Sequence, residues 1–430
     1  MALEFSEIEA GGRRIPLYLL QFDKQGAPNS TATRQALVDA VRAHDYRDVY
    51  IFAHGWNNGF DDSLELFQRF FTGFLAARTA DPEWKPVFVG IQWPSLVLVF
   101  PWEKGPQLAG VDEDNAFQKE AIADLASELD NDLARRFIAL AVKGGVTAAE
   151  QKELVQLAHA ALHGDSFDET GDSLPDPGDL LDSWRALQAS DAEAIDGEFG
   201  FADEDGAGPQ AAGLEVLDPR NLVRTATVYM MKDRAGVIGN VAVRPLLEEF
   251  AAAGARIRLI GHSYGARVVL AALSTANLQQ KVRSALLLQP AVNQFCFAEA
   301  GRIPKSQKAG GFKPALDRLQ GPLYSTFSGK DFPLHETFHL ALRRSKDLGE
   351  AEIAAGAPPS IYCALGGYGP SGLADGSVVR MQIQDAGAYA IPPGSRIVAL
   401  DGTQGRINGH GDVTNRYACW ALVDQDQRAV

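Results

Sequence analysis

Cysteine is scarce in this chain. Its 430 residues include three cysteines, Cys296, Cys363 and Cys419, which stand far apart in the sequence. An odd number of isolated cysteines argues against a disulfide framework and is typical of a reducing compartment.

Long apolar segments are missing as well. The longest apolar run, Leu96 to Trp102, is far shorter than the ~20 residues that a membrane-spanning helix needs. Residues 1–8 have neither the basic start nor the apolar run of a secretory signal peptide. We therefore expect a soluble, cytoplasmic protein without a transmembrane segment.

Basic residues are outnumbered, and the excess of acid is local. The formal net charge is −15, and residues 164–206 contain fourteen Asp or Glu against the single Arg185. With no basic stripe to follow a phosphate backbone, the chain is not expected to bind nucleic acid. The acidic segment is interpreted as a solvated face, with a protein partner bound through residues 164–206 as the alternative.

The sequence does contain a regular alternation of short apolar runs and helical periodicity. Strands that alternate with helices form a parallel sheet covered on both faces, so these runs predict an α/β fold with functional residues at the carboxyl ends of the strands. The predicted strands are residues 15–22, 49–53, 87–91, 257–260, 285–288, 323–327 and 397–400.

The alternation stops over residues 103–215, which we interpret as a cap or lid inserted into a core formed by residues 1–102 and 216–430. The cap is expected to contain ordered helices followed by a mobile acidic stretch, residues 164–206. Its predicted helical segments are residues 115–142 and 148–163.

A long helical region follows the cap, from Asp218 to about Ala253. Its glycines and proline predict interruptions near residues 236, 239 and 245. Its charged triplet, Lys232-Asp233-Arg234, is interpreted as an intrahelical cluster, with a position facing the functional site as the alternative.

The most informative motif is Gly261-His262-Ser263-Tyr264-Gly265, which lies between a buried strand and a helix of small and apolar residues. A G-x-S-x-G turn in that setting is typical of a nucleophile elbow, in which the serine hydroxyl is exposed above the sheet. The motif therefore predicts Ser263 as a nucleophile.

A second loop, which begins His54-Gly55-Trp56 and continues with Asn57-Asn58-Gly59, directly follows another buried strand. Acyl transfer requires two N–H donors for the developing oxyanion, one after the nucleophile and one from an early loop. The backbone N–H groups of Trp56 and Tyr264 are the predicted donors. His54, Gly55 and His262 are expected to shape the loops.

A serine nucleophile also needs a base and an acid, which in this architecture follow it along the chain. Five of the eight histidines precede Ser263, and of the others only His410 lies in a glycine-flanked loop after the last predicted strand. Asp331 follows the penultimate predicted strand and is the favoured acid, with Asp401 and Asp412 as alternatives.

Taken together, the elbow, the His54 loop, Trp93-Pro94-Ser95 and Gly409-His410-Gly411-Asp412 resemble the α/β-hydrolase superfamily, and the HGWNN form is similar to a branch found in bacteria and fungi. The resemblance covers residues 1–100 and 216–430. It implies the α/β-hydrolase fold, Ser263, Asp331 and His410 as a catalytic triad, and Trp56 with Tyr264 as the oxyanion hole.

One rival motif, His335-Glu336-Thr337-Phe338-His339, matches the H-E-x-x-H of zinc peptidases. Pro333 places the start of a helix next to His335, whereas a zinc helix carries this motif in its interior, and no third ligand stands out. A catalytically silent scaffold that binds a partner is a further alternative, although it has no chemical need for a complete set of serine, histidine and acid.

The sequence thus predicts a serine hydrolase of the esterase or lipase-like type that uses an acyl-enzyme and requires no metal or organic cofactor. A carboxylic ester is the expected substrate, with amides and thioesters open. The apolar run 96–102 is expected to pack beneath the cap or to line an acyl pocket.

Overall fold

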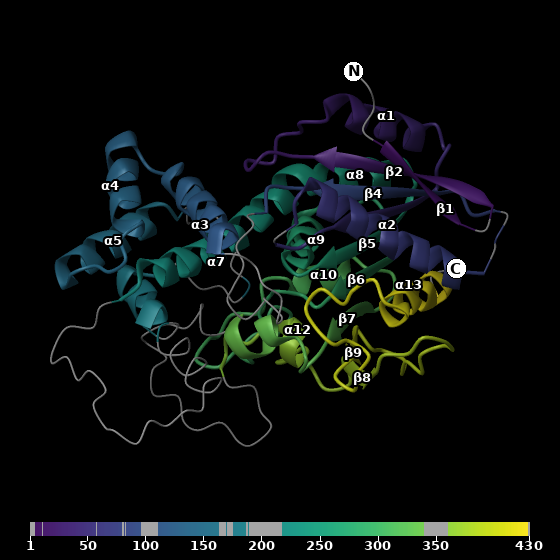
Figure 1. Cartoon of the computed structure of the whole chain (residues 1–430). Coiled ribbons are helices and arrows are strands. Elements are labelled where there is room, and N and C mark those ends of the chain that lie inside the picture. Colours follow the sequence, from purple (N-terminus) through teal and green to yellow (C-terminus); the bar gives the residue numbers. More distant parts are fainter. Residues whose placement is uncertain are drawn as a thin grey trace.

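The computed structural model describes residues 5–10, 12–56, 58–79, 81, 83–95, 111–162, 169, 175–185, 188, 217–338 and 360–428. The predicted α/β class and the mostly parallel sheet are confirmed. Nine strands form one sheet in the order β1-β2-β4-β3-β5-β6-β7-β9-β8, and only β1 is antiparallel to its neighbour (Figure 1). The strands are β1 Phe5–Ala10, β2 Arg13–Gln21, β3 Asp48–Ala53, β4 Pro86–Gln92, β5 Arg256–His262, β6 Ser284–Leu288, β7 Leu323–Phe327, β8 Val378–Gln382 and β9 Ile397–Asp401.

All seven strands predicted from sequence are present, but two edge strands, β1 and β8, were missed. Edge strands bury little, so their apolar signal is weak: β1 carries Glu7 and Glu9, and every residue of β8 is at least partly exposed. Both take their place in the sheet through pairing with β2 and β9, which a local pattern does not reveal.

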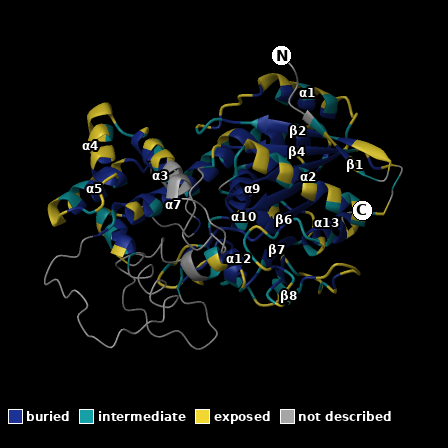
Figure 2. Cartoon of the chain, in the orientation of Figure 1, coloured by how far each residue is buried: buried dark blue, intermediate teal, exposed yellow. Residues whose placement is uncertain are grey.

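Helices cover both faces of the sheet. Residues of β3 alternate between two apolar clusters, with Val49 and Ile51 on the face of α8 and α9 and with Tyr50 and Phe52 on the face of α2 and α13. Figure 2 shows the sheet buried between these layers. The helices described are α1 Thr31–Arg42, α2 Phe60–Ala77, α3 Val111–Ala126, α4 Asn131–Ala141, α5 Ala148–Ala160, α7 Pro219–Val237, α8 Arg244–Ala252, α9 Tyr264–Thr275, α10 Lys313–Asp317, α12 Leu365–Tyr368, α13 Arg416–Arg428 and two π-helical segments, η2 Ile238–Val243 and η3 Pro333–Thr337.

Helices α3, α4 and α5 lie beside the outer part of α7, away from the sheet (Figure 1). The predicted helix 115–142 is wrong in one respect, because α3 ends at Ala126 and α4 begins at Asn131 after an extended Asp130. Their apolar residues belong to the same cluster as one face of the sheet. The division into a core and a cap at residues 102 and 215 therefore stays a prediction, since its boundaries fall outside the described residues.

The long helical region after Asp218 is not interrupted as expected. α7 passes directly into η2 and then into α8, so the predicted breaks near Gly236, Gly239 and Pro245 appear as a π-helical segment inside one continuous helix. Pro245 lies in the first turn of α8, where a proline is tolerated.

The interpretation of Lys232-Asp233-Arg234 as a local cluster is wrong for Arg234. Its guanidinium forms two hydrogen bonds with the carboxylate of Asp124 in α3, at 2.8 and 3.1 Å, and its side chain is 6% exposed. Such a bidentate pair fixes geometry as well as charge. Arg234 therefore ties α3 to α7.

The acidic segment 164–206 is only partly described, and one of its residues contradicts the expectation of a solvated face. Glu169 is fully buried and forms an ion pair with Arg267 of α9. Leu180 and Trp184 are also buried, in the apolar cluster that includes α7. Residues 189–206 and the apolar run 96–102 lie outside the described residues. The predicted mobility of the former and the predicted packing of the latter therefore stay predictions.

None of the helices within the described ranges has the length and apolar character needed to cross a bilayer.

Candidate active site

The order and register of the strands bring five loops to one edge of the sheet. Ala53 of β3 pairs with Gly261 of β5, so the loop that starts at His54 lies beside the Ser263 turn. On the other side, His262 pairs with Leu288 of β6. β7 and β9 follow next to β6, and their carboxyl ends carry the loops of Asp331 and His410.

Ser263 occupies a strained corner between β5 and α9. Its backbone has φ 54° and ψ −123°, a conformation that non-glycine residues rarely adopt and that recurs at functional sites. Ser263 is the N-cap of α9, yet its side chain makes no capping hydrogen bond. Its hydroxyl is instead directed to His410.

Two glycines allow the chain to pass this close to itself. A Cβ at Gly265 would lie 2.0 Å from the carbonyl oxygen of Ala53, and a Cβ at Gly55 would lie 2.6 Å from the Cβ of Ser263. Neither position has room for a side chain. Gly55 therefore shapes its loop, as expected, by letting it rest directly on the Ser263 turn.

Ser263, His410 and Asp331 form a continuous hydrogen-bonded chain. The Ser263 Oγ lies 2.9 Å from His410 Nε2, and His410 Nδ1 lies 2.9 Å from Asp331 Oδ2. Because a carboxylate only accepts, Nδ1 is the protonated nitrogen and Nε2 accepts the serine O–H. The free lone pair of the imidazole is thereby held on the hydroxyl of Ser263.

Asp331 is fully buried, and its second oxygen accepts the backbone N–H of Leu334 at 3.2 Å. The two alternative acids bond elsewhere. Asp401 accepts from the side-chain amide of Gln382 and the backbone N–H of Thr403, at 3.0 and 2.8 Å. Asp412 accepts from the backbone of Asn408 and the side chain of Asn415 within its own loop.

The loop of His410 is held by one residue that the sequence did not single out. The Gln289 Nε2 donates to the carbonyl oxygens of Gly409 and His410, at 2.7 and 2.9 Å. Gln289 is buried and has φ 38°. The only sequence feature that could have indicated this role is the position of Gln289 directly after β6, at the same edge of the sheet as the other loops.

His262 supports the same loop from the other side. Its Nε2 lies 3.0 Å from the carbonyl oxygen of His410 and donates to it. Burial, together with the nearby His410, lowers the pKa of His262 to about 3. His262 is therefore neutral at ordinary pH and does not oppose the positive charge that His410 gains when it accepts a proton.

His54 organises the early loop. Its Nδ1 donates to the carbonyl oxygen of Gly55 at 2.8 Å, and its Nε2 accepts the backbone N–H of Trp93 at 3.2 Å. The indole of Trp93 stacks on the His54 ring and donates to the His54 carbonyl oxygen. Burial lowers the pKa of His54 to about 4, so the neutral ring required by these bonds is the stable form.

This arrangement predicts an acid-labile fold. The unfolded chain protonates His54 near its usual pKa of 6.5 and the folded chain only near 4, so the unfolded state holds more protons between these values. Stability present above pH 6.5 is lost as the pH falls toward 4. We expect His54→Gln to reduce the loss between pH 7 and pH 5 by about 2 kcal/mol, measured by urea unfolding.

The matched control is His44→Asn, which replaces an exposed histidine outside the His54 loop. An equal loss of stability between pH 7 and pH 5 in the parent and in His54→Gln would contradict the assignment.

The predicted oxyanion donors lie next to Ser263. Tyr264 is the first residue of α9, where a backbone N–H has no acceptor within the helix. Trp56 follows Gly55, and its ring contacts that of Tyr264 edge-on at 5.9 Å. The Asn58 side chain donates to the carbonyls of Gly55 and Trp56 and fixes the loop, while Asn57 is outside the described residues.

The zinc motif is only partly described. His335 lies in η3 and stacks on Tyr368, with ring centroids 4.2 Å apart. Its position in the turn after Pro333 agrees with the expected helix start. Over the described part of the chain, no three His, Cys, Asp or Glu residues lie close enough to share a metal ion, and His339 is outside that part.

Neither family models nor curated proteins nor solved structures give a significant match to this chain, so the chemistry proposed for the site rests on its geometry.

Proposed function

We propose that the chain is a serine hydrolase of the α/β-hydrolase fold that cleaves a carboxylic ester. The observation that carries the proposal is the hydrogen-bonded chain from Ser263 through His410 to Asp331, with Ser263 at a backbone φ of 54°. A serine, a neutral imidazole and a buried carboxylate in this order are the parts needed to activate a hydroxyl for attack.

The arrangement of the sheet supports the hydrolase fold. The nucleophile follows β5 in the middle of a mostly parallel sheet, the acid follows β7 and the histidine follows β9. This is the chain order Ser, acid, His that accompanies a nucleophile elbow in that fold.

In the first half of the proposed reaction, His410 Nε2 takes the proton of Ser263 while the Oγ attacks the ester carbonyl carbon. The negative charge that develops on the carbonyl oxygen is stabilised by the backbone N–H groups of Trp56 and Tyr264. Asp331 stabilises the imidazolium and keeps the ring in place. His410 then gives its proton to the leaving alkoxide, which departs as an alcohol.

In the second half, His410 removes a proton from water, which attacks the acyl-enzyme carbonyl carbon. The tetrahedral intermediate collapses, Ser263 leaves with the proton returned by His410, and a carboxylic acid is released. An ester is proposed because the apolar run 96–102 and the helical insertion suit an acyl or alkyl group.

The test is labelling by a fluorophosphonate, which reacts with activated serines. We expect the parent to be labelled and Ser263→Ala to be unlabelled, because the phosphorus is attacked by the hydroxyl that His410 activates. Ser274→Ala provides a matched control, since Ser274 is a buried serine of α9, the helix that Ser263 caps, and has no part in the proposed mechanism. We expect this variant to be labelled like the parent.

An unlabelled parent, or a labelled Ser263→Ala, would refute the serine mechanism. Hydrolysis that a zinc chelator abolishes and Ser263→Ala leaves intact would favour the motif of His335 and His339. If neither activity is found, a binding scaffold is favoured, to be tested by pull-down with and without residues 189–206, a deletion that leaves the buried Glu169 in place.

A further inference from the structure

The backbone of His410 is tied to the sheet by two side chains. Residues 402–415, between β9 and α13, belong to neither a helix nor a strand. The carbonyl oxygen of His410 accepts two hydrogen bonds, from Gln289 Nε2 at 2.9 Å and from His262 Nε2 at 3.0 Å. These donors stand at the carboxyl ends of two paired strands, β6 and β5, and β5 leads directly into Ser263. The loop of His410 is thus fixed to the strand that precedes Ser263.

The backbone of Gln289 is itself held firmly. Its N–H donates to Thr326 Oγ1 of β7 at 2.8 Å, Pro290 follows it, and its side chain is fully buried. Its φ of 38° is uncommon for a residue other than glycine. Such a backbone persists only where the surrounding structure enforces it, and it recurs at functional sites. The place from which the amide reaches the His410 loop is therefore well defined.

The direction of the Gln289 amide is set by its acceptors. Its Nε2 donates to the carbonyl oxygens of Gly409 and His410, at 2.7 and 2.9 Å, so the opposite orientation would place Oε1 against two other oxygens. In the observed orientation, Oε1 is buried and has no hydrogen-bond partner among the described residues. A buried acceptor without a partner lowers stability. The amide therefore holds two carbonyls of the loop although this leaves its own oxygen unpaired.

His262 holds the same carbonyl from the neighbouring strand. Its side chain is buried, and its ring lies beside that of His410 with the centroids 5.0 Å apart. Because burial and the nearby His410 lower the pKa of His262 to about 3, the ring is neutral and donates from Nε2. It can thus hold the loop without placing a second positive charge beside the imidazolium that the proposed reaction forms.

The position of the His410 backbone matters because its ring bonds in two directions. Nε2 lies 2.9 Å from Ser263 Oγ, and Nδ1 lies 2.9 Å from Asp331 Oδ2. The ring is rigid, so rotation of the side chain cannot restore both distances after a shift of the backbone. A displacement of about 1 Å in an active site can cost about 10²-fold in rate. The side chains that hold this backbone therefore bear on the rate.

We propose that Gln289 and His262 are positioning residues for His410. Their N–H groups hold the backbone of its loop and so keep His410 Nε2 within hydrogen-bond distance of Ser263 Oγ. The inference rests on the proposed serine hydrolase function and goes beyond it, because it assigns a part in the rate to two residues outside the triad and the oxyanion hole. Both act through His410 and not on the ester itself.

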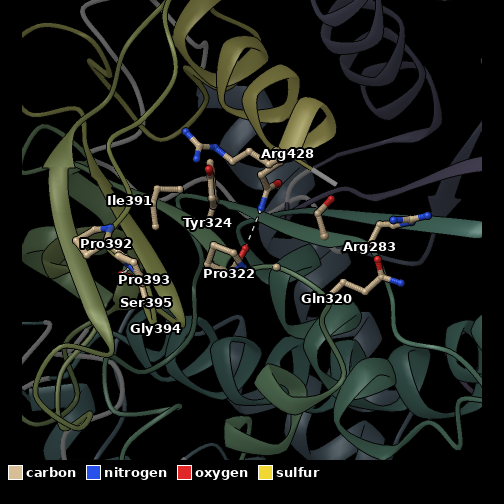
Figure 3. A pocket seen from close by; sticks show the side chains of 13 residues that line it. Arg283, Gln320, Pro322, Tyr324, Ile391, Pro392, Pro393, Gly394, Ser395 and Arg428 are labelled. Atoms are coloured by element: carbon tan, nitrogen blue, oxygen red, sulfur yellow. Dashed lines mark hydrogen bonds between the residues drawn. The ribbon is translucent and has the colours of Figure 1, made fainter. Parts of the chain in front are cut away.

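A second glutamine provides a matched control. Gln425 is 3% exposed, its Nε2 donates to the carbonyl oxygens of Ala285 and Pro322 at 3.0 and 3.3 Å, and its Oε1 is also buried without a partner in the described part of the chain. It lines a cavity at the opposite end of the sheet, where the dashed line to Pro322 marks one of these bonds (Figure 3). Ala285 precedes Gln289 by four residues, or roughly 13 Å of strand. Gln425→Met thus removes a similar pair of hydrogen bonds far from Ser263.

The experiment compares Gln289→Met with Gln425→Met in the steady-state hydrolysis of a p-nitrophenyl ester. We expect kcat of Gln289→Met to fall by about tenfold or more, with KM within a few-fold of the parent, because a displaced base slows the chemistry and not the binding of substrate. Gln425→Met should keep the parental kcat, although the midpoints of urea unfolding should shift to a similar extent in both variants. A parental kcat in Gln289→Met, or an equal loss in both variants, would overturn the proposal.

His262 offers a second pair of variants, which decides the matter if Gln289→Met does not fold. The side-chain amide of glutamine places a donor close to the position of the imidazole Nε2, so His262→Gln retains the hydrogen bond that His262→Met removes. We expect kcat of His262→Gln to stay near that of the parent and kcat of His262→Met to fall. Equal kcat values in the two variants would count against the hydrogen bond and overturn the proposal.

The double variant Gln289→Met/His410→Ala tests whether Gln289 acts through His410. It should be as slow as His410→Ala alone, because without the imidazole there is nothing left to position. If Gln289→Met instead lowers the residual rate by the same factor as in the parent, it acts on the fold in general and the proposal is wrong.

The failure of this proposal is distinguishable from the failure of the proposed function. If a fluorophosphonate labels the parent but not Ser263→Ala, and Gln289→Met keeps the parental kcat, the positioning role alone is overturned. If the parent is neither labelled nor active on esters, the serine hydrolase function is refuted, and the positioning role with it.

Discussion

Asp331→Asn is expected to lower kcat for ester hydrolysis by about 10⁴-fold, because an amide in place of the buried carboxylate holds the imidazole in the wrong tautomer. In the parent, Asp331 accepts the Nδ1 proton of His410 at 2.9 Å, which leaves Nε2 free to accept from Ser263. Asparagine presents an N–H or a carbonyl there and provides no negative charge for the imidazolium. Steady-state kinetics with a p-nitrophenyl ester measures the effect.

The matched control is Asp401→Asn, which makes the same change at the acid that the sequence left as an alternative. Asp401 bonds to Gln382 and to the backbone of Thr403, and the structure shows no bond from it to His410. We expect kcat to stay within a few-fold of the parent. A large loss in Asp401→Asn together with a small one in Asp331→Asn would reverse the assignment of the acid.

Residues that act as one unit are not additive. His410→Ala alone is expected to lower kcat at least as much as Asp331→Asn, and the double variant should be no slower than His410→Ala. If the fold-loss of kcat in the double variant equals the product of the losses in the two single variants, Asp331 acts independently of His410. That result would contradict the role inferred from their hydrogen bond.

The elbow was predictable because its geometry is local. Gly261 to Gly265 combine a strand end, a corner and a helix start in five residues, so the pattern alone indicates where the hydroxyl lies. The His54 loop was predictable for the same reason. The acid was predicted less sharply, as Asp331 with Asp401 and Asp412 as alternatives, since Asp331 and His410 are separated by 79 positions and only the packing of β7 against β9 brings them together.

Gln289 and the edge strands escaped prediction for a related reason. Nothing near Gln289 in the sequence indicates that its amide reaches a loop 120 residues further along the chain. β1 and β8 depend on one neighbour each, so their residues lack the continuous apolar pattern of a central strand. Local composition predicts a strand well where the strand is fully buried. It predicts a strand poorly where the strand forms only because it pairs with a neighbour in the sheet.

Glu169 is the most informative failure of the sequence interpretation. The sequence alone does not distinguish one carboxylate in an acidic run from another, and such runs usually form a solvated face. Yet Glu169 pairs with Arg267, which is 98 positions away in α9, and it also accepts the backbone N–H of Asn293 at 2.6 Å. The acidic part of the predicted cap is thus anchored to Arg267, four residues after Ser263.

Breaking this pair is expected to have the largest effect on stability. Arg267 is 1% exposed and Glu169 is fully buried, so Arg267→Met leaves an uncompensated carboxylate in the interior. Removal of one partner of a buried ion pair costs about 3–5 kcal/mol, and we expect a loss of that size in urea unfolding. Arg136→Met is the control, because its bidentate pair with Glu153 is exposed, and an exposed ion pair contributes little to the free energy of unfolding.

The double variant Arg267→Met/Glu169→Gln separates the cost of the unpaired Glu169 charge from the cost of the altered packing at Arg267. If the cost comes from the stranded carboxylate, the neutral amide should restore a large part of the stability, because Gln can still accept the Asn293 N–H. If the double variant is as unstable as the sum of the single variants, the two residues act independently and the pair does not anchor the insertion. Recovery of stability with a lower kcat would instead mean that the anchor positions the helix of the nucleophile, since Arg267 lies one turn beyond Ser263 in α9.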